Sequence, residues 1–124
     1  MLTHFRDTGR KPEDYDLILS GDLGLIGKSV VIDLLREQGI DIKENYNDCG
    51  AIIFDGNTQD THAGGSGCAC AGLTFCGYIY RLLKEKKLNR VLFMATGALQ
   101  STLSVQQGES MPGIAHAVSI QNML

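Results

Sequence analysis

The fold of this chain is decided by one glycine-rich stretch, Thr61-His62-Ala63-Gly64-Gly65-Ser66-Gly67-Cys68-Ala69-Cys70-Ala71-Gly72. Gly64, Gly65 and Gly67 allow the backbone to turn tightly and to approach a neighbouring segment where a Cβ would clash. Ser66 is a favourable N-cap residue, so we expect a helix to begin there. The apolar residues that follow at helical spacing, and that predict its buried face, are Leu73, Cys76, Ile79 and Leu83.

The first turns of this expected helix, residues 68–72, carry only cysteine, alanine and glycine. Because these residues are small on every side, we expect this end of the helix to be packed tightly all round and to point into the protein. Its free backbone N–H groups and the positive end of its dipole favour a carboxylate or a phosphate there. The alternative interpretation is a close-packed joint between a strand and a helix that binds no ligand.

Composition and charge describe one ordinary α/β domain, residues 1–124. Hydrophobic residues make up 44% of the chain and charged residues 20%, which is typical of a globular protein. The formal net charge of −3 provides no basic surface, so we expect no nucleic acid as a partner. No apolar run approaches the length of a membrane span, so any membrane association is expected to be peripheral. The four cysteines lie in apolar segments, as in proteins of a reducing compartment.

Apolar runs between turn residues predict strands at residues 16–20, 49–55, 91–96 and 114–120. The three segments between these strands are predicted to be a helix, a second helix and a long irregular loop, in that order. This alternation predicts an α/β fold, with a mixed sheet of about four to five strands flanked by helices.

The helix expected between the first two strands has its buried face at Ile26, Val30, Leu34 and Leu35. Gly39 is placed to end it. Residues 1–5 are expected to be the last turns of a helix, which suggests that the chain is cut from a longer one.

One motif after the first expected strand resembles a phosphate-binding loop. Gly21-Asp22-Leu23-Gly24-Leu25-Ile26-Gly27-Lys28-Ser29 ends in the Gly-Lys-Ser of such a loop, and residues 51–55 resemble the apolar strand whose Asp holds magnesium. The spacing is wrong, because the first glycine of the motif would stand where this chain has Asp22. A carboxylate there would also repel phosphate. A nucleotide-binding domain is thus an alternative, against the expectation that Lys28 and Ser29 are solvated helix positions.

The cysteines suggest two further kinds of chemistry. Cys68 and Cys70, with His62 upstream, have the residue types of a zinc site, but residues two apart on a helix point about 200° apart and could not hold one ion. We therefore expect no metal and no cofactor. Cys68 near a helix N-terminus is a candidate nucleophile, because that position lowers a thiol pKa. The alternative is that it is a small hydrophobic residue, like Cys49 and Cys76.

Further motifs follow one another along the chain: Tyr15-Asp16-Leu17-Ile18, Gly21-Asp22-Leu23-Gly24, Asp48-Cys49-Gly50, Ala63-Gly64-Gly65-Ser66-Gly67-Cys68, Ala95-Thr96-Gly97-Ala98-Leu99, Ser104, Gln106-Gln107, Glu109-Ser110 and Ile114-Ala115-His116-Ala117-Val118. In this order they resemble the stage V sporulation protein AD family, nearly from end to end. The resemblance covers only the C-terminal part of that family, and it implies that an N-terminal half is absent from residues 1–124.

This resemblance implies a fold and a role. The family has the thiolase fold, in which two similar α/β halves face each other, and its members resemble binding proteins more than working thiolases. The implied function is to bind dipicolinic acid, free or with calcium, for its uptake into the developing spore. The implied partners are other stage V sporulation channel proteins, at the cytoplasmic side of the forespore and peripheral to the spore inner membrane. The resemblance also implies a part in transport and in germination.

The wider thiolase superfamily is matched less well. Its C-terminal half carries a His-Pro-x-Gly-x-Ser-Gly loop with a catalytic histidine, but His62-Ala63-Gly64 is one residue short of that loop and lacks the proline. Thr96-Gly97-Ala98 stands near the place of the Cys-x-Gly-Gly-Gly motif and has no cysteine. We therefore expect no catalytic residue, and a fragment of a thiolase-like or ketoacyl-synthase-like acyl-transfer enzyme is the alternative.

His116 lies on the last expected strand, and alternation places it on one face with Ile114, Val118 and Ile120. It is expected to be either a hydrogen-bonded core histidine or a donor to a ligand carboxylate. Glu109 and Ser110, in the loop before it, are candidate contacts for calcium or the ligand.

The ligand-binding residues predicted from this sequence are Gly64, Gly65, Ser66, Gly67 and His116. N–H groups at a helix start beside a close-packed glycine wall suit a flat dicarboxylate. Because a few strands and helices leave apolar area uncovered, we expect the chain to form a homo-oligomer.

Overall fold

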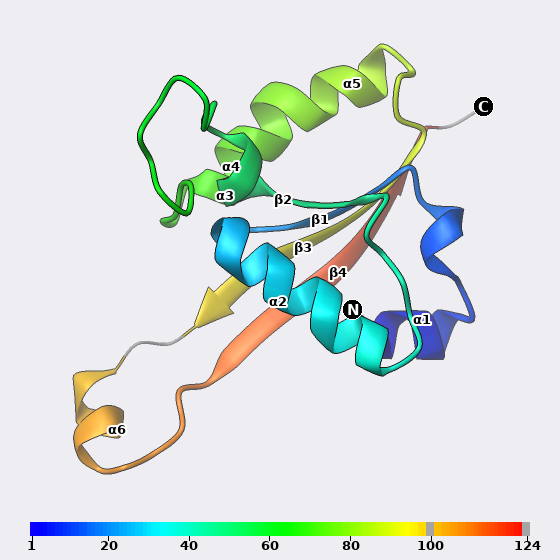
Figure 1. Cartoon of the computed structure of the whole chain (residues 1–124). Coiled ribbons are helices and arrows are strands. Elements are labelled where there is room, and N and C mark those ends of the chain that lie inside the picture. The colour runs from blue at the N-terminus through cyan, green and yellow to red at the C-terminus, as the bar shows by residue number, and fades with distance from the viewer. Residues whose placement is uncertain (99–100, 123–124) are drawn as a thin grey trace.

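The computed structural model describes residues 1–98 and 101–122, which form a four-stranded sheet (Figure 1). The strands lie side by side in the order β2 (Tyr46–Asp48), β1 (Leu17–Ser20), β3 (Arg90–Ala98) and β4 (Gly113–Gln121). β1 is parallel to β2 and to β3, whereas β4 is antiparallel to β3. The predicted fold class, a mixed α/β sheet flanked by helices, is confirmed.

Helices pack on both faces of the part of the sheet formed by β2, β1 and the first residues of β3. The helical elements of the described residues are α1 (Leu2–Thr8), the 3₁₀ turn η1 (Pro12–Asp14), α2 (Gly24–Glu37), α3 (Cys49–Ile52), α4 (Cys70–Thr74), the π-helical turn η2 (Phe75–Ile79), α5 (Tyr80–Lys84) and α6 (Thr102–Gln106). α4, η2 and α5 follow one another without a break and form one rod, which we call the α4–α5 helix. α2 and the α4–α5 helix lie on opposite sides of the sheet, and α6 stands apart at the tip of the excursion between β3 and β4 (Figure 1).

Two hydrophobic clusters, one on each face of the sheet, form the core. On one face, residues of α1 and α2 pack on the sheet, and the cluster contains Phe5, Tyr15, Ile18, Leu35, Ile42, Tyr46, Leu92 and Met94. On the other face, the α4–α5 helix and α3 pack on the sheet, and the cluster contains Leu19, Cys49, Cys70, Ile79, Leu83 and Val91. Alternate residues of β1 and β3 therefore point to opposite clusters, as the pleat of a strand requires.

The face that α2 buries differs from the predicted one. Leu35 is buried, but Ile26, Val30 and Leu34 have 70%, 49% and 56% of their surface exposed. Val31 and Ile32 pack against the core instead. Apolar side chains occur on all sides of this helix, so their spacing alone could not decide which side faces the sheet.

The helix end predicted at Gly39 is confirmed, and Gly9 ends α1 in the same way. Gly9 follows α1 with a φ of 68°, and Gly39 follows α2 with a φ of 75°, both in the left-handed region that favours glycine. The N–H groups of Gly39 and Ile40 donate to the carbonyls of Arg36 and Leu35, which are otherwise unpaired at a helix end.

The strand predicted at residues 49–55 is wrong. The strand is β2, which ends at Asp48, and Cys49–Ile52 is the short helix α3. The side chain of Asp48 accepts a hydrogen bond from the N–H of Gly50 and so caps α3 at its N-terminus. This cap turns an apolar run of strand-like composition into a helix.

The α4–α5 helix begins later than predicted, and its buried face is different. Ser66 does not cap it, since the helix starts at Cys70 after Ala69. Its first turn is not enclosed on all sides, because Cys68, Ala69 and Gly72 are exposed. Leu73, with 64% of its surface exposed, and Cys76 face outward too.

The π-helical turn explains this difference. The buried residues of the α4–α5 helix are Cys70, Thr74, Ile79 and Leu83, which are spaced by four, five and four residues. The interval of five falls on η2, where one extra residue enters the helix. A prediction that assumes a constant helical period therefore selects the wrong buried residues before the π turn and the correct ones after it.

β4 confirms the predicted strand, but its central residues are exposed on both faces. His116 pairs with Ala95 of β3 and is exposed, so the interpretation as a core histidine is wrong. The uncovered end of β4 lies beyond the reach of the α4–α5 helix. Within the loop predicted as irregular, α6 forms, and Ser101 caps it by accepting a hydrogen bond from the N–H of Ser104.

Candidate functional site

An open cleft of about 890 Å³ lies at the carboxyl ends of β1 and β3, beside the start of β4. Its lining comes from the turn after β1, the loop before the α4–α5 helix, and the two strand ends. These residues are Asp22, Leu23, Ser66, Gly67, Cys68, Thr96, Gly97, Ala98, Gly113, Ile114 and Ala115. The carboxyl ends of neighbouring parallel strands are where ligands bind in open α/β sheets.

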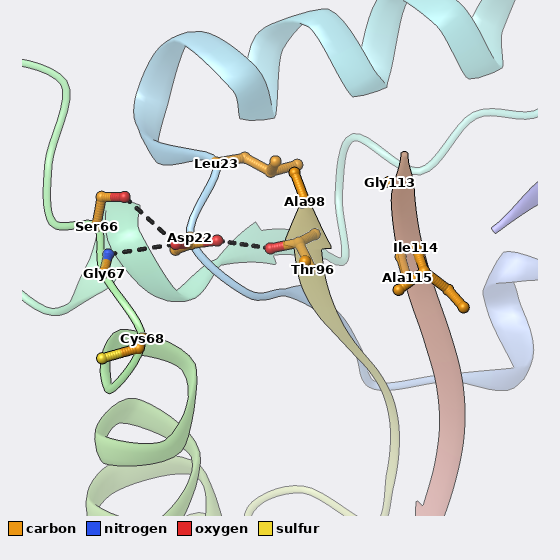
Figure 2. Close-up of a pocket in the computed structure, with 11 residues that line it drawn as sticks. Asp22, Leu23, Ser66, Gly67, Cys68, Thr96, Ala98, Gly113, Ile114 and Ala115 are labelled. Atoms are coloured by element: carbon orange, nitrogen blue, oxygen red, sulfur yellow. Dashed lines mark hydrogen bonds between the residues drawn. The ribbon is translucent and has the colours of Figure 1, made fainter. Parts of the chain in front are cut away.

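Asp22 lies at the centre of the cleft wall and joins two segments to the turn after β1 (Figure 2). Its Oδ1 accepts a hydrogen bond from Thr96 Oγ1 at 2.6 Å. Its Oδ2 accepts bonds from Ser66 Oγ and from the N–H of Gly67, both at 3.3 Å. The carboxylate thus orients the hydroxyl groups of Ser66 and Thr96 at the cleft surface.

A second carboxylate, Asp48, holds this turn in place from inside the protein. Asp48 is fully buried, and it accepts hydrogen bonds from Ser20 Oγ at 2.6 Å, from the N–H groups of Leu23 and Gly24 at 3.0 and 2.8 Å, and from the N–H of Gly50 at 2.9 Å. One side chain therefore caps both α2 and α3. Its hydrogen bonds compensate for the cost of burying a carboxylate.

The glycine-rich loop crosses α3 at backbone contact distance. The N–H of Gly65 donates to the carbonyl of Gly50 at 2.7 Å. A Cβ on Gly50 would collide with the carbonyl oxygen of Gly65, and a Cβ on Gly64 would collide with the carbonyl oxygen of Gly50. Gly64 also has a φ of 106°, which side-chain-bearing residues rarely adopt. The tight joint predicted from Gly64 and Gly65 is present, and it positions the loop that carries Ser66.

The structure brings together some of the predicted ligand-binding residues and separates others. Ser66 and Gly67 line the cleft. Gly64 lies in the crossing with α3, and Gly65 lines a smaller neighbouring cavity of about 380 Å³. His116 is outside the lining of the cleft, one residue beyond Ala115 on the exposed surface of β4.

Sequence reasoning missed Asp22 and Thr96 as site residues. Both residues stand in motifs that carry the family resemblance, but neither Asp22, which breaks the spacing of a phosphate-binding loop, nor Thr96, near the place of a missing cysteine motif, is predicted to bind a ligand. The signal that could have found them is their common position, directly after β1 and near the end of β3. Parallel neighbouring strands bring such positions to one edge of the sheet.

The charge of the cleft is negative. Asp22 is the one ionisable acid or base among the described lining residues other than the thiol of Cys68. No lysine, arginine or histidine lines the cleft within the described residues. A dianionic ligand would therefore meet a carboxylate here, and it needs a source of positive charge to bind.

The start of α2 is not arranged to hold phosphate. The N–H groups of Leu23 and Gly24 donate to Asp48, and the N–H of Leu25 donates to the carbonyl of Ala63 at 2.7 Å. Lys28 is half-buried, and its Nζ donates to Asn47 Oδ1 at 3.1 Å. The donors that a phosphate-binding loop would use are thus already bonded within the protein.

The cysteines divide into two exposed and two buried thiols. Cys68 and Cys76 are exposed, whereas Cys49 and Cys70 are buried. Burial, with a smaller contribution from the charge of Asp48, raises the pKa of Cys49 to about 12, and burial also raises the pKa of Cys70. Figure 2 shows Cys68 at the edge of the cleft with its side chain directed away from Asp22. Across residues 1–98 and 101–122, no three His, Cys, Asp or Glu side chains gather as metal ligands would.

Comparison with known proteins places the chain in a family. The family model described as Stage V sporulation protein AD matches residues 1–121. Stage V sporulation protein AD of Bacillus subtilis (strain 168) is 47% identical over 115 residues, which cover 93% of this chain and 34% of that protein. The chain thus spans about a third of the length of the curated relative that it matches. In the described part of the chain, no helix is long and apolar enough to cross a membrane. The chain belongs to the stage V sporulation protein AD family.

Proposed function

We propose that this chain is part of a protein that binds dipicolinic acid, in its calcium form, for uptake into the developing spore. The observation that carries the proposal is the cleft at the ends of β1 and β3, in a chain of a sporulation protein family. The hydroxyl groups of Ser66 and Thr96 donate their protons to Asp22, so this wall presents oxygen atoms, which suit a cation such as calcium. The small residues Gly97, Ala98 and Gly113 leave a flat surface for an aromatic ring.

Asp22 favours the calcium-bound form of the ligand. Dipicolinate alone carries two negative charges, and the described cleft offers it a carboxylate and no cationic side chain. Calcium binds carboxylate oxygen atoms, so Asp22 would help to hold a calcium ion that arrives with dipicolinate. Without calcium, the positive charge has to come from a part of the protein outside this chain.

The cleft is open, and we propose that a second half of the protein closes it. Residues 1–124 are then one thiolase-like half, and the missing N-terminal half supplies the opposite wall. This chain covers 34% of its Bacillus subtilis relative, so about two thirds of such a protein remains to supply that wall. The protein is proposed to act without catalysis, at the cytoplasmic side of the forespore and peripheral to the spore inner membrane, together with other stage V sporulation channel proteins.

Calorimetric titration tests the proposal on the assembled protein. The chain is co-expressed with the part of the Bacillus subtilis relative that it does not match, and dipicolinate is added with and without calcium. We expect saturable binding that is tighter with calcium. Asp22→Asn is expected to weaken calcium-dependent binding by about tenfold or more, as for a lost charged interaction. Thr96→Val, which keeps the carboxylate, is the matched control and should lose less. Absence of binding in both titrations would overturn the proposal.

An acyl-transfer enzyme is the second candidate, because Cys68 lines the cleft. A nucleophilic thiol needs a base to take its proton, and no histidine lines the described part of the cleft. Incubation of the assembled protein with acyl-coenzyme A, followed by mass spectrometry, would reveal an acylated Cys68 if this candidate were correct.

A further inference from the structure

A cluster of four polar side chains lies at the end of the sheet opposite to the cleft. It joins α1, the segment that leads into β1, and β4, and it consists of His4, Arg10, Tyr15 and Ser119. Tyr15 precedes β1, and Ser119 pairs with Leu92 near the start of β3. None of these four described residues lines the cleft, so the proposed function leaves the cluster without a role.

The hydroxyl oxygen of Tyr15 is the centre of this cluster. It lies 2.8 Å from His4 Nε2 and accepts a hydrogen bond of 3.0 Å from Arg10 Nη1. The same Nη1 donates a second bond, of 2.8 Å, to Ser119 Oγ. A guanidinium nitrogen can only donate, and Nη1 carries two hydrogens, one for each of these bonds. The carboxylate of Asp14, on η1, adds a favourable charge near Arg10.

This arrangement decides which atom donates between Tyr15 and His4. Tyr15 is 3% exposed, so its hydroxyl group has little access to water. Because Arg10 already donates to the hydroxyl oxygen, the hydroxyl hydrogen is available as a donor, and His4 Nε2 is the acceptor within reach. All hydrogen bonds of the cluster are therefore satisfied when His4 is neutral and carries its proton on Nδ1.

A second proton on His4 is incompatible with these bonds. The imidazolium ion has a hydrogen on each ring nitrogen, so Nε2 would direct a donor at Tyr15, and the buried hydroxyl hydrogen would lose its acceptor. Burial of His4, followed by the positive charges of Arg10 and of the amino group of Met1, lowers the pKa of His4 from its ordinary value of 6.5. The carboxylate of Asp7 acts in the opposite direction and has a smaller effect.

We propose that His4, Tyr15 and Arg10 form a proton-controlled latch, which holds α1 on the sheet while His4 is neutral and releases it when His4 is protonated. α1 is suited to such a release, because of its seven residues only Phe5 is buried. Phe5 and Tyr15 belong to the first core cluster, so the latch lies beside the contact that seats the helix. A helix of two turns depends on its packing to stay folded.

The direction of the pH dependence follows from the lowered pKa of His4. Above pH 6.5, the ordinary pKa of histidine, His4 is neutral whether α1 is seated or released, and the latch is fully closed. As the pH falls below this value, the released and unfolded forms bind a proton that the seated form resists, so the stability conferred by the latch declines. The inference does not rest on the proposed function, because the latch and the cleft occupy different ends of the sheet.

NMR spectroscopy of the chain tests the latch. We expect His4 to titrate at a lower pH in the native chain than in the same chain unfolded in urea. Between about pH 7.5 and about pH 5, the nuclear Overhauser effects between the rings of His4 and Tyr15, whose centroids lie 5.9 Å apart, should be lost. The backbone chemical shifts of α1 should move towards unfolded values, whereas those of β1 and β3 should not. Equal changes in α1 and in the strands would indicate global unfolding and would overturn the inference.

His4→Gln separates the latch from other effects of acid. A glutamine carbonyl can accept the proton of Tyr15 but does not titrate, so α1 should stay seated at about pH 5 in this variant. His62→Gln is the matched control, because His62 is an exposed histidine whose Nδ1 lies 3.4 Å from Asp60 Oδ1, and its replacement should leave the pH response of α1 unchanged.

Tyr15→Phe keeps the test decisive if His4→Gln folds poorly. It retains the buried ring and removes the hydroxyl group that donates to neutral His4, so it should raise the pH at which His4 titrates. Release of α1 in His4→Gln to the same extent as in the unaltered chain, or no release in the unaltered chain, would overturn the inference. An unchanged titration of His4 in Tyr15→Phe would also do so.

Discussion

Thr96 Oγ1 donates a hydrogen bond of 2.6 Å to Asp22 Oδ1, and this bond joins the carboxyl ends of β3 and β1 at the cleft. The two residues are 74 positions apart in the sequence. Gly21, next to Asp22, leaves no room for a Cβ, since such an atom would lie 2.7 Å from Thr96 Oγ1. The turn that carries Asp22 therefore packs directly against the end of β3.

Thr96→Val is expected to destabilise the chain by about 1–2 kcal/mol, the range for a hydrogen bond to a charged group that is only partly buried. Thr58→Val is the control, since Thr58 Oγ1 donates to Asp55 Oδ2 at 3.0 Å in an exposed loop. Thr58→Val should lower the free energy of unfolding by less than about 0.5 kcal/mol. Urea unfolding of both variants gives the comparison, and equal stabilities would contradict the role assigned to Thr96.

Gly64→Ala is expected to unfold the chain or to destabilise it by about 2 kcal/mol or more, because its Cβ meets the carbonyl of Gly50 and its φ is 106°. Gly65→Val should also be harmful, since its Cβ would lie 2.6 Å from Ile53 Cγ2. Gly56→Ala, at an open loop position, is the control. A melting temperature of Gly64→Ala within a degree or two of the control would show that the crossing is not tight.

Stability is expected to fall as the pH rises above about 9. Burial raises the pKa of Tyr46 to about 12 from an ordinary value of 10.0, and the pKa of Cys49 to about 12 from 9.0. Between these values the unfolded chain loses protons that the folded chain keeps, so each group lowers the folding equilibrium constant by up to about tenfold per pH unit. Below about pH 9 both groups are protonated in both states and contribute nothing to this dependence.

Unfolding in urea at about pH 8 and about pH 11 measures this pH dependence. Tyr46→Phe should reduce the loss of stability between the two conditions, whereas Tyr80→Phe, at an exposed position, should leave it unchanged. The same loss in all three proteins would show that Tyr46 does not contribute.

Cys68 and Cys76 are expected to react with a thiol reagent in the native chain, and Cys49 and Cys70 only after unfolding, because the first two are exposed and the others buried. The raised pKa of Cys49 and of Cys70 slows their reaction further, since the thiolate is the reactive form. Mass spectrometry of the labelled chain before and after addition of urea counts the modified residues. Rapid native labelling of Cys49 would contradict the packing of the second core cluster.

Three of the four strands, β1, β3 and β4, could be predicted from the sequence because they are apolar runs bounded by turn residues, whereas β2 (Tyr46–Asp48) is polar and was missed. The buried faces of the helices could not be predicted. α2 carries apolar residues on all sides, and the extra residue in the π turn Phe75–Ile79 breaks the helical period. The strand predicted at residues 49–55 failed because Asp48 caps a helix there, an effect that depends on its hydrogen bond to Gly50.

The candidate site was partly predictable for a similar reason. The glycine-rich loop has a local signal, and the structure places Ser66 and Gly67 in the cleft. Asp22 and Thr96 depend on contacts between distant segments, which a single sequence does not reveal. His116 was predicted from its position on the last strand, and it lies outside the cleft lining, on an exposed part of β4.

The measurement that tests the central claim most directly is the affinity for dipicolinate, with calcium present, of the isolated chain and of its complex with the rest of the family protein. The account predicts no measurable binding by the isolated chain, since it supplies only one wall of the cleft, and saturable binding by the complex. Micromolar binding by the isolated chain, or no binding by a well-formed complex, would contradict it.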